Sequence, residues 1–154
     1  MANTYTQIYI HIVFAVEGRQ SLIPPEHNEE LQKYITGIVS SQKHKLIATN
    51  NMPDHLHLLI GLRPDASLSD LVGDVKAFSA KFINEKHLIA GRFSWQEGFG
   101  AFSYARSQLG TVIRYIENQP RHHHKKLFRE EYIELLEKFE VDYDQRYIFK
   151  TSAG

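Results

Sequence analysis

The sequence contains no cysteine, which excludes a disulfide scaffold, a thiolate metal site and a cysteine nucleophile. It also has no apolar run near the roughly 20 residues that a transmembrane helix needs, so no membrane partner is expected. Residues 1–16 have no basic region ahead of their apolar stretch and are not typical of a signal peptide. With 154 residues and no repeat or linker-like segment, the chain is expected to be one cytoplasmic domain, 1–154, acting at the nucleoid.

The sequence has no excess of charge of either sign, because 18 Lys and Arg residues balance 18 Asp and Glu residues. Such a balance argues against a nucleic-acid partner, since domains of that kind usually carry a basic excess. The charges are unevenly placed, however: residues 76–126 hold nine basic and three acidic residues, whereas residues 129–154 hold four basic and seven acidic. The neutral average therefore hides a basic middle and an acidic C-terminal segment. An uneven scatter of surface charge is the alternative interpretation.

Hydrophobic periodicity predicts an α+β fold. The predicted order, β-α-β-β-α-β-α-α, is typical of a ferredoxin-like or RNA-recognition-like sandwich, in which helices cover one face of an antiparallel sheet. Ser67 or Ser69 can cap the second helix. Strands are predicted at 5–16, 43–51, 55–62 and 93–104, helices at 26–40, 68–87, 107–118 and 129–140, and an extended tail at 143–149.

One motif with metal-binding chemistry lies on the predicted strand 55–62. His55 and His57 are two residues apart, so both imidazoles point to one face of a strand and can bind the same cation. The chain has nine histidines, so a pair at this spacing also arises by chance. Two polar residues on a half-exposed strand are the alternative.

A second candidate lies on the predicted helix 107–118. Tyr115 and Gln119 are four residues apart, at the margin of the apolar stripe of this helix. A phenol beside a neutral carbonyl ligand suits a metal-assisted tyrosine nucleophile, because tyrosine needs a polarised target and a stabilised phenolate. His55, His57 and Gln119 around Mg²⁺ or Mn²⁺ would leave positions for phosphate oxygens. Alternatively, Tyr115 only packs at the helix margin.

Basic and aromatic residues are interspersed in the window 76–126. Aromatic rings stack on unpaired bases while cations follow the phosphate backbone, which is the usual arrangement for single-stranded nucleic acid. Most of these aromatic residues are expected in the core, so the basic residues are the better candidates. The predicted DNA-binding residues are Lys76, Lys81, Arg92, Arg106 and Arg114.

Four segments in the right order resemble the single-tyrosine HUH transposases of the smallest bacterial insertion sequences, the TnpA type with its REP-associated relatives. They are the strand YTQIYIHIVFAV, the segment MPDHLHLLI, the segment WQEGFGAFSY and the segment RYIENQPRHH. The resemblance covers roughly residues 5–125. Asp54 departs from the pattern, because the family usually has Asn before its histidine pair.

The resemblance implies a role for each candidate. His55 and His57 match the HUH pair, Gln119 matches the third metal ligand and Tyr115 matches the nucleophile. The family cleaves single-stranded DNA beside an imperfect hairpin, forms a 5′-phosphotyrosine intermediate and later rejoins the strand, with a divalent metal and no nucleotide cofactor. It works as a homodimer, in which one subunit's tyrosine helix can complete the other's site. Gly110 is then a candidate hinge.

Other interpretations remain open. Tyr104 is a rival nucleophile, but it has no carboxamide at helical spacing. The histidine run 122–124 is expected to lie in a solvated loop and is not assigned as a ligand. A non-catalytic RNA- or single-stranded-DNA-binding module would need exposed aromatic residues on its sheet. A metal phosphoesterase that hydrolyses its substrate, or a domesticated relative with no element to move, would also carry these residues.

Overall fold

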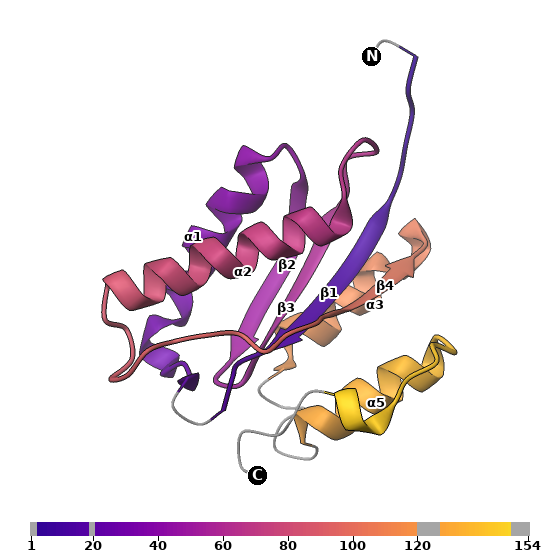
Figure 1. Cartoon of the computed structure of the whole chain (residues 1–154). Coiled ribbons are helices and arrows are strands. Elements are labelled where there is room, and N and C mark those ends of the chain that lie inside the picture. Colours follow the sequence, from indigo (N-terminus) through magenta and orange to yellow (C-terminus); the bar gives the residue numbers. More distant parts are fainter. Residues whose placement is uncertain (1–2, 19–20, 120–126, 149–154) are drawn as a thin grey trace.

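The computed structural model describes residues 3–18, 21–119 and 127–148, and its elements follow the predicted order (Figure 1). Four strands form one antiparallel sheet in the order β2-β3-β1-β4, which is the ferredoxin-like order. The strands are β1 (Tyr9–Ala15), β2 (Lys45–Met52), β3 (His55–Gly61) and β4 (Gly100–Tyr104). The helices are α1 (Asn28–Ser41), α2 (Leu68–Glu85), α3 (Leu109–Glu117) and α5 (Phe128–Lys138). The α+β prediction is confirmed.

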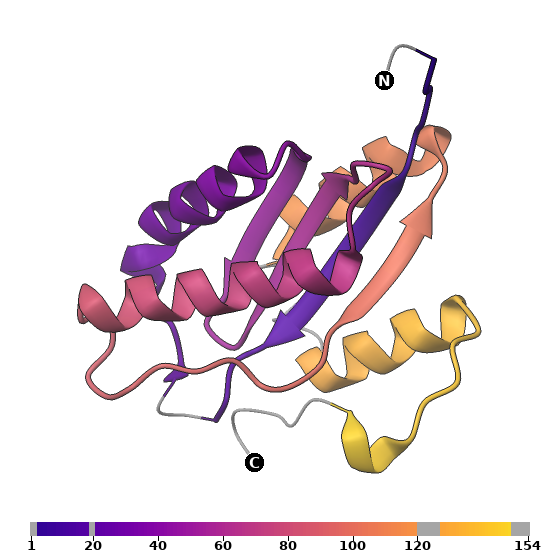
Figure 2. The ribbon, with the colours of Figure 1, turned by 45° about the horizontal axis from the view of Figure 1, so that its top comes forward.

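The long helices α1 and α2 lie side by side on one face of the sheet (Figure 2). Because side chains alternate along a strand, Leu56, Leu58 and Ile60 of β3 all point to this face and are buried in the main core. The apolar stripe of α2 supplies Leu71 and other buried residues to the same core. The predicted cap of α2 is present, since the Ser67 hydroxyl accepts a hydrogen bond from the backbone of Asp70 at 3.2 Å.

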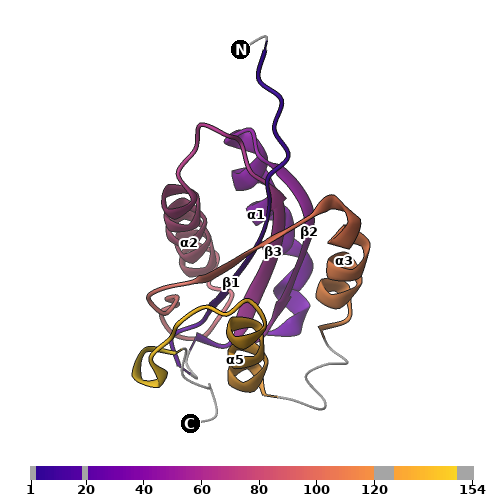
Figure 3. The ribbon, with the colours of Figure 1, turned by 90° about the vertical axis from the view of Figure 1, so that its right-hand side faces the viewer.

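The opposite face of the sheet is covered as well. Helices α2 and α3 lie on opposite sides of the strands (Figure 3). Val112 and Ile116 of α3 pack on Leu59 of β3, and Tyr132 of α5 packs on Gly100 of β4. The expectation of helices on one face holds for α1 and α2, and α3 and α5 form an additional layer. This layer covers the face to which His55 and His57 point.

Some local features differ from the sequence prediction, and β1 begins at Tyr9 and not at residue 5. Strand β4 is shorter than the predicted 93–104, because Gly98 has a φ of 86° and Lys76 binds the carbonyls of Gln96 and Gly98 at 2.9 and 2.6 Å. Ahead of β4, only an isolated bridge joins Trp95 to Val16. The predicted tail 143–149 contains a 3₁₀ turn, Gln145–Tyr147, which Asp144 caps. A 3₁₀ turn, Pro25–His27, leads into α1, and another, Arg106–Gln108, leads into α3.

The described helices include none long and apolar enough to cross a membrane. The histidine run 122–124 lies outside the described residues.

Candidate functional site

Strand β3 places the predicted histidine pair in the interior, between the sheet and the layer of α3 and α5. Both side chains are fully buried. Strand alternation explains why both point the same way, and their ring centroids lie 5.0 Å apart. The two imidazoles therefore share one small polar space under the helices.

Each histidine ring is oriented by a neighbour through its Nδ1 atom. Nδ1 of His55 lies 2.7 Å from the carboxylate of Asp54, so this nitrogen carries the proton that Asp54 accepts. Nδ1 of His57 lies 2.7 Å from Nε2 of His11 on β1. Burial, reinforced by the adjacent His57, lowers the pKa of His11 well below its usual 6.5. Asp54, where the family usually has Asn, thus points Nε2 of His55 into the shared space.

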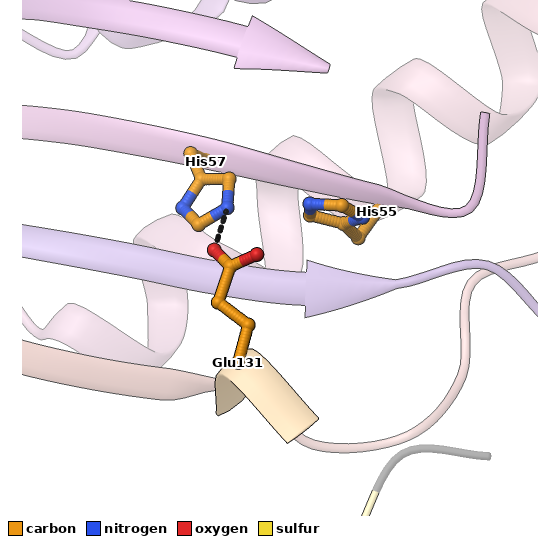
Figure 4. Close-up of side chains that lie close together, drawn as sticks. All are labelled: His55, His57 and Glu131. Carbon is orange, nitrogen blue, oxygen red and sulfur yellow. Dashed lines mark ion pairs between the residues drawn. The ribbon is translucent and has the colours of Figure 1, made fainter. Parts of the chain in front are cut away.

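Helix α5 contributes a buried carboxylate to this space. Glu131 is 5% exposed, and its Oε1 atom lies 3.4 Å from Nε2 of His57 (Figure 4). Phe128, one turn earlier on α5, stacks on the ring of His55 with 4.0 Å between centroids. Donor atoms of His55, His57 and Glu131 all lie within 4.8 Å of one another.

Tyr115 and Gln119 converge on the same carboxylate. The hydroxyl of Tyr115 donates a hydrogen bond to Oε1 of Glu131, and Nε2 of Gln119 donates to it at 3.0 Å. The ring of Tyr115 lies 5.8 Å from that of His57, in the same chain. The buried apolar residues of α3, which fix the rotation of this helix on the sheet, bring Tyr115 to this position.

The surroundings of Tyr115 keep its hydroxyl protonated. Burial, and then the charge of Glu131, raise the pKa of Tyr115 far above its usual value near 10. A phenolate next to this carboxylate is therefore unfavourable unless a cation neutralises the carboxylate.

The donor set fits a divalent cation. The carbonyl oxygen of Gln119 lies 3.2 Å from Nε2 of His55, whose other nitrogen holds its proton toward Asp54. An imidazole nitrogen and a carboxamide oxygen, both able to bind divalent cations, thus lie side by side in the shared space. His55, His57 and Glu131 form a group able to hold a divalent metal, with imidazole and carboxylate ligands typical of such ions.

The five predicted DNA-binding residues fall on two sides of the molecule. Arg106 is exposed in the 3₁₀ turn ahead of α3, and Arg114, next to Tyr115 in the sequence, is exposed on α3. Lys76 and Lys81 lie on α2, across the sheet from the histidines, and Arg92 is exposed in the segment between α2 and β4. Lys81 forms an ion pair with Glu85 at 3.9 Å.

Glu131 and His11 are the site residues that the sequence interpretation missed. Glu131 had a usable signal, because it lies three residues after Phe128 and four before Leu135, two buried residues of α5. A charged residue on an apolar stripe is rarely buried without a partner. His11 had a weaker signal, a histidine inside an alternating apolar strand.

A histidine pair on a ferredoxin-like sheet, with a tyrosine beside it on a helix, is the arrangement expected of the HUH-type DNA strand transferases that the sequence resembles. Residues 4–119 match the family model described as IS200-like transposase. The chain belongs to this family and is an HUH-type enzyme, as the sequence resemblance predicted.

Individual relatives agree with the family match. The chain is 24% identical over 118 residues to the ISDra2 transposase TnpA of Deinococcus radiodurans. The aligned region covers 73% of this chain and 84% of the relative. A crystal structure described as a transposase of D. radiodurans superposes with a TM-score of 0.59 at 23% identity, covering 76% of this chain and 94% of the other. The structure of a REP-associated tyrosine transposase bound to a REP hairpin also superposes with a TM-score of 0.59, at 18% identity. The superposition covers 79% of this chain and 72% of the other. These structures support the fold.

Proposed function

We propose that this chain cleaves and rejoins single-stranded DNA at hairpin-marked ends, through a covalent bond between Tyr115 and a 5′-phosphate. The observation that carries the proposal is the convergence of Tyr115, Gln119 and the buried histidine pair within one chain. Family membership supports the reaction class, and the hairpin-bound relative supports a hairpin substrate.

In the proposed reaction, the oxygen of Tyr115 attacks the phosphorus of a DNA phosphodiester. The bond from phosphorus to the 3′-oxygen breaks, and the phenol's proton is finally carried by that oxygen as a free 3′-hydroxyl. Attack of a 3′-hydroxyl on the phosphotyrosine reverses these changes and rejoins a strand. Because the covalent ester conserves the free energy of the phosphodiester, rejoining needs no nucleotide cofactor.

The buried side chains have separate tasks in this proposal. His55 and His57, with Gln119 and Glu131, would hold Mg²⁺ or Mn²⁺, which supplies positive charge for the phosphate oxygens. Glu131 also holds the Tyr115 hydroxyl toward the histidines and accepts its hydrogen bond. Arg106 and Arg114 would bind the phosphates of the strand that is cut.

Two expectations from the sequence remain part of the proposal. A homodimer is one of them, and Gly110 would be a hinge only if the tyrosine helix of one subunit served the other. The predicted cytoplasmic action at the nucleoid is the other. The recognition-module alternative is disfavoured, because both faces of the described sheet are covered by helices and Phe102 of β4 is buried. Bases therefore find no open stacking platform on the sheet.

The test of the proposal is a covalent adduct. Incubation with Mn²⁺ and single-stranded, hairpin-bearing DNA is expected to give a protein–DNA species that survives denaturation. Tyr115→Phe should abolish it while the variant still binds DNA, and Tyr104→Phe is the matched control that should retain it. Adduct formation by Tyr115→Phe, or product release by hydrolysis with no adduct, would reject the assignment of the nucleophile.

A further inference from the structure

A cavity of about 320 Å³ opens beside Tyr115, between α3 and α5. This volume falls at the lower end of the roughly 300–1,000 Å³ typical of small-molecule sites. Its walls combine apolar and aromatic groups with a polar rim. The lining residues are Tyr104, Ser107, Gln108, Thr111, Val112, Tyr115, Leu135 and Lys138.

The cavity and the candidate metal group share the side chain of Tyr115. The ring of Tyr115 forms part of the cavity wall, while its hydroxyl reaches Glu131 in the metal group. A DNA phosphate that is attacked by this hydroxyl therefore comes close to a residue that lines the cavity. The base next to that phosphate then lies within reach of the opening.

The chemistry of the lining suits one unpaired base. Tyr104, Val112 and Leu135 offer flat or apolar surface for its faces, and Leu135 and Val112 are buried. Ser107 and Thr111 offer hydroxyls at the rim for its polar edge. A base taken out of a strand is held by this combination of stacking and edge hydrogen bonds.

Basic side chains near the rim of the cavity are suited to the negatively charged DNA phosphates that flank such a base. Lys138 lines the cavity from α5, and Arg114 lies 3.4 Å from the hydroxyl of Thr111. Arg106 directly precedes Ser107 at the same end. Of the predicted DNA-binding residues, these two arginines are the ones that flank the cavity.

We propose that this cavity binds the nucleobase adjacent to the scissile phosphate and so selects the sequence at the cleavage site. The inference rests on the proposed function, since it needs a strand positioned at Tyr115. It adds direct reading of one base by the protein, a specificity determinant that the catalytic residues themselves do not supply.

A photo-crosslinking experiment tests occupancy without requiring cleavage. Tyr115→Phe protein is mixed with random-sequence single-stranded DNA that carries 5-iodouracil in place of thymine, then irradiated and digested for mass spectrometry. Crosslinks are expected in the peptides that contain Tyr104 or the α5 residues Leu135 and Lys138. Crosslinks confined to other peptides would overturn the proposal.

A pair of matched variants makes the result specific to the cavity. Thr111→Trp, at an exposed rim position, should fill the cavity without disturbing the core and reduce these crosslinks about tenfold, given the 1–3 kcal/mol of one stacked base. Glu117→Trp places the same ring on the same helix outside the cavity and should leave the yield unchanged. Equal yields for both variants would overturn the proposal.

Sequencing of covalently linked strands separates this inference from the proposed function. Active protein, Mn²⁺ and a random single-stranded library are expected to yield adducts with one preferred base beside the cut, a preference that Thr111→Trp removes. Adducts with no base preference, or with one that Thr111→Trp leaves unchanged, would reject the cavity and keep the nucleophile. No adduct together with crosslinks in the cavity would reject the proposed chemistry and keep the base site.

Discussion

At the scale of single residues, the site centres on Glu131. Its Oε1 atom contacts His57, Tyr115 and Gln119, which come from β3, α3 and the residues just after α3. This carboxylate ties the histidine pair to the tyrosine, and its negative charge contributes to the raised pKa of Tyr115. Removing the charge while keeping the shape should therefore affect both metal binding and the phenol.

Glu131→Gln is expected to weaken Mn²⁺ binding by DNA-free protein about tenfold, because an amide replaces a hard anionic ligand. Isothermal titration calorimetry measures the affinity. Glu130→Gln, at the exposed neighbouring position on α5, is the control and should bind as the unmodified protein does. The pKa of Tyr115 should also fall in Glu131→Gln, because the amide carries no negative charge beside the phenol. Unchanged metal affinity would remove Glu131 from the ligand set.

The difference between predicted and missed residues at this scale has a physical reason. His55 and His57 lie within one strand, and Tyr115 and Gln119 within about one helical turn, so local periodicity and the family motif were enough to find them. Glu131 enters the site only through the packing of α5 on the sheet, a contact that strand and helix patterns do not encode. Residues 128–138 also lie beyond the family match, so the resemblance had no motif to offer there.

At the scale of elements, the packing of α5 depends on a close contact with β4. A Cβ atom added to Gly100 would lie 2.6 Å from the ring of Tyr132, which is closer than two carbon atoms can approach. The glycine thus lets the aromatic ring lie directly on the strand.

Gly100→Ala is expected to lower the free energy of unfolding by about 1–3 kcal/mol, the usual cost of overpacking. Urea denaturation measures the loss. In the Gly100→Ala/Tyr132→Leu double variant, the smaller side chain should remove part of the clash, so the two effects should be less than additive. Fully additive effects would show that the two positions do not clash.

His44 couples the start of β2 to the residues after β3. Its Nδ1 atom accepts a hydrogen bond from the backbone of Arg63 at 3.0 Å. Burial, and then the nearby Arg63 charge, lower the pKa of His44 below 6.5. The unfolded chain therefore binds this proton at a higher pH than the folded chain. The contribution of neutral His44 to stability is complete above about pH 6.5 and is lost as the pH falls through the folded pKa.

In the His44→Asn variant, the free energy of unfolding should depend less on pH in this range. The side-chain oxygen of Asn can take the place of Nδ1 as acceptor, but it does not titrate. Urea denaturation between about pH 5 and pH 7 should show a smaller acid loss for the variant than for the unmodified protein. Parallel profiles would mean that other groups control the acid loss.

At the scale of the whole molecule, one chain brings Tyr115 and the histidine pair together. With 5.8 Å between the rings of Tyr115 and His57, the site needs no residue from a second copy. Nucleophile and ligands acting within the same chain are therefore expected, whether or not the protein dimerises.

Complementation between inactive variants tests this expectation. A mixture of Tyr115→Phe and His57→Ala proteins should remain as inactive in adduct formation as either variant alone. If the tyrosine of one subunit served the histidines of another, mixed dimers would regain activity. Recovery in the mixture would therefore contradict assembly within one chain.

The separation of basic residues across the sheet leads to a test with two DNA substrates. On an unstructured oligonucleotide, Arg114→Ala should weaken binding and reduce the salt slope by about one, because the proposed function places the cut strand along α3. Lys81→Ala, on α2, should matter only for DNA that also carries a hairpin, which is large enough to reach beyond the cleavage site. Fluorescence anisotropy at several salt concentrations measures both slopes. Equal effects of Lys81→Ala on the two substrates would reject this division.

The position of α5 after the family match affects how the chain can be shortened. A chain ending at residue 119 would keep every motif that identifies the family. It would also lose three aromatic contacts of the C-terminal segment. These are the contacts of Phe128 with His55, of Tyr132 with Gly100 and of Phe139 with Phe102. Their loss would expose aromatic and apolar surface around the histidines. A minimal nicking enzyme made from this protein therefore has to retain the chain through residue 139, or replace the uncovered surface with polar residues.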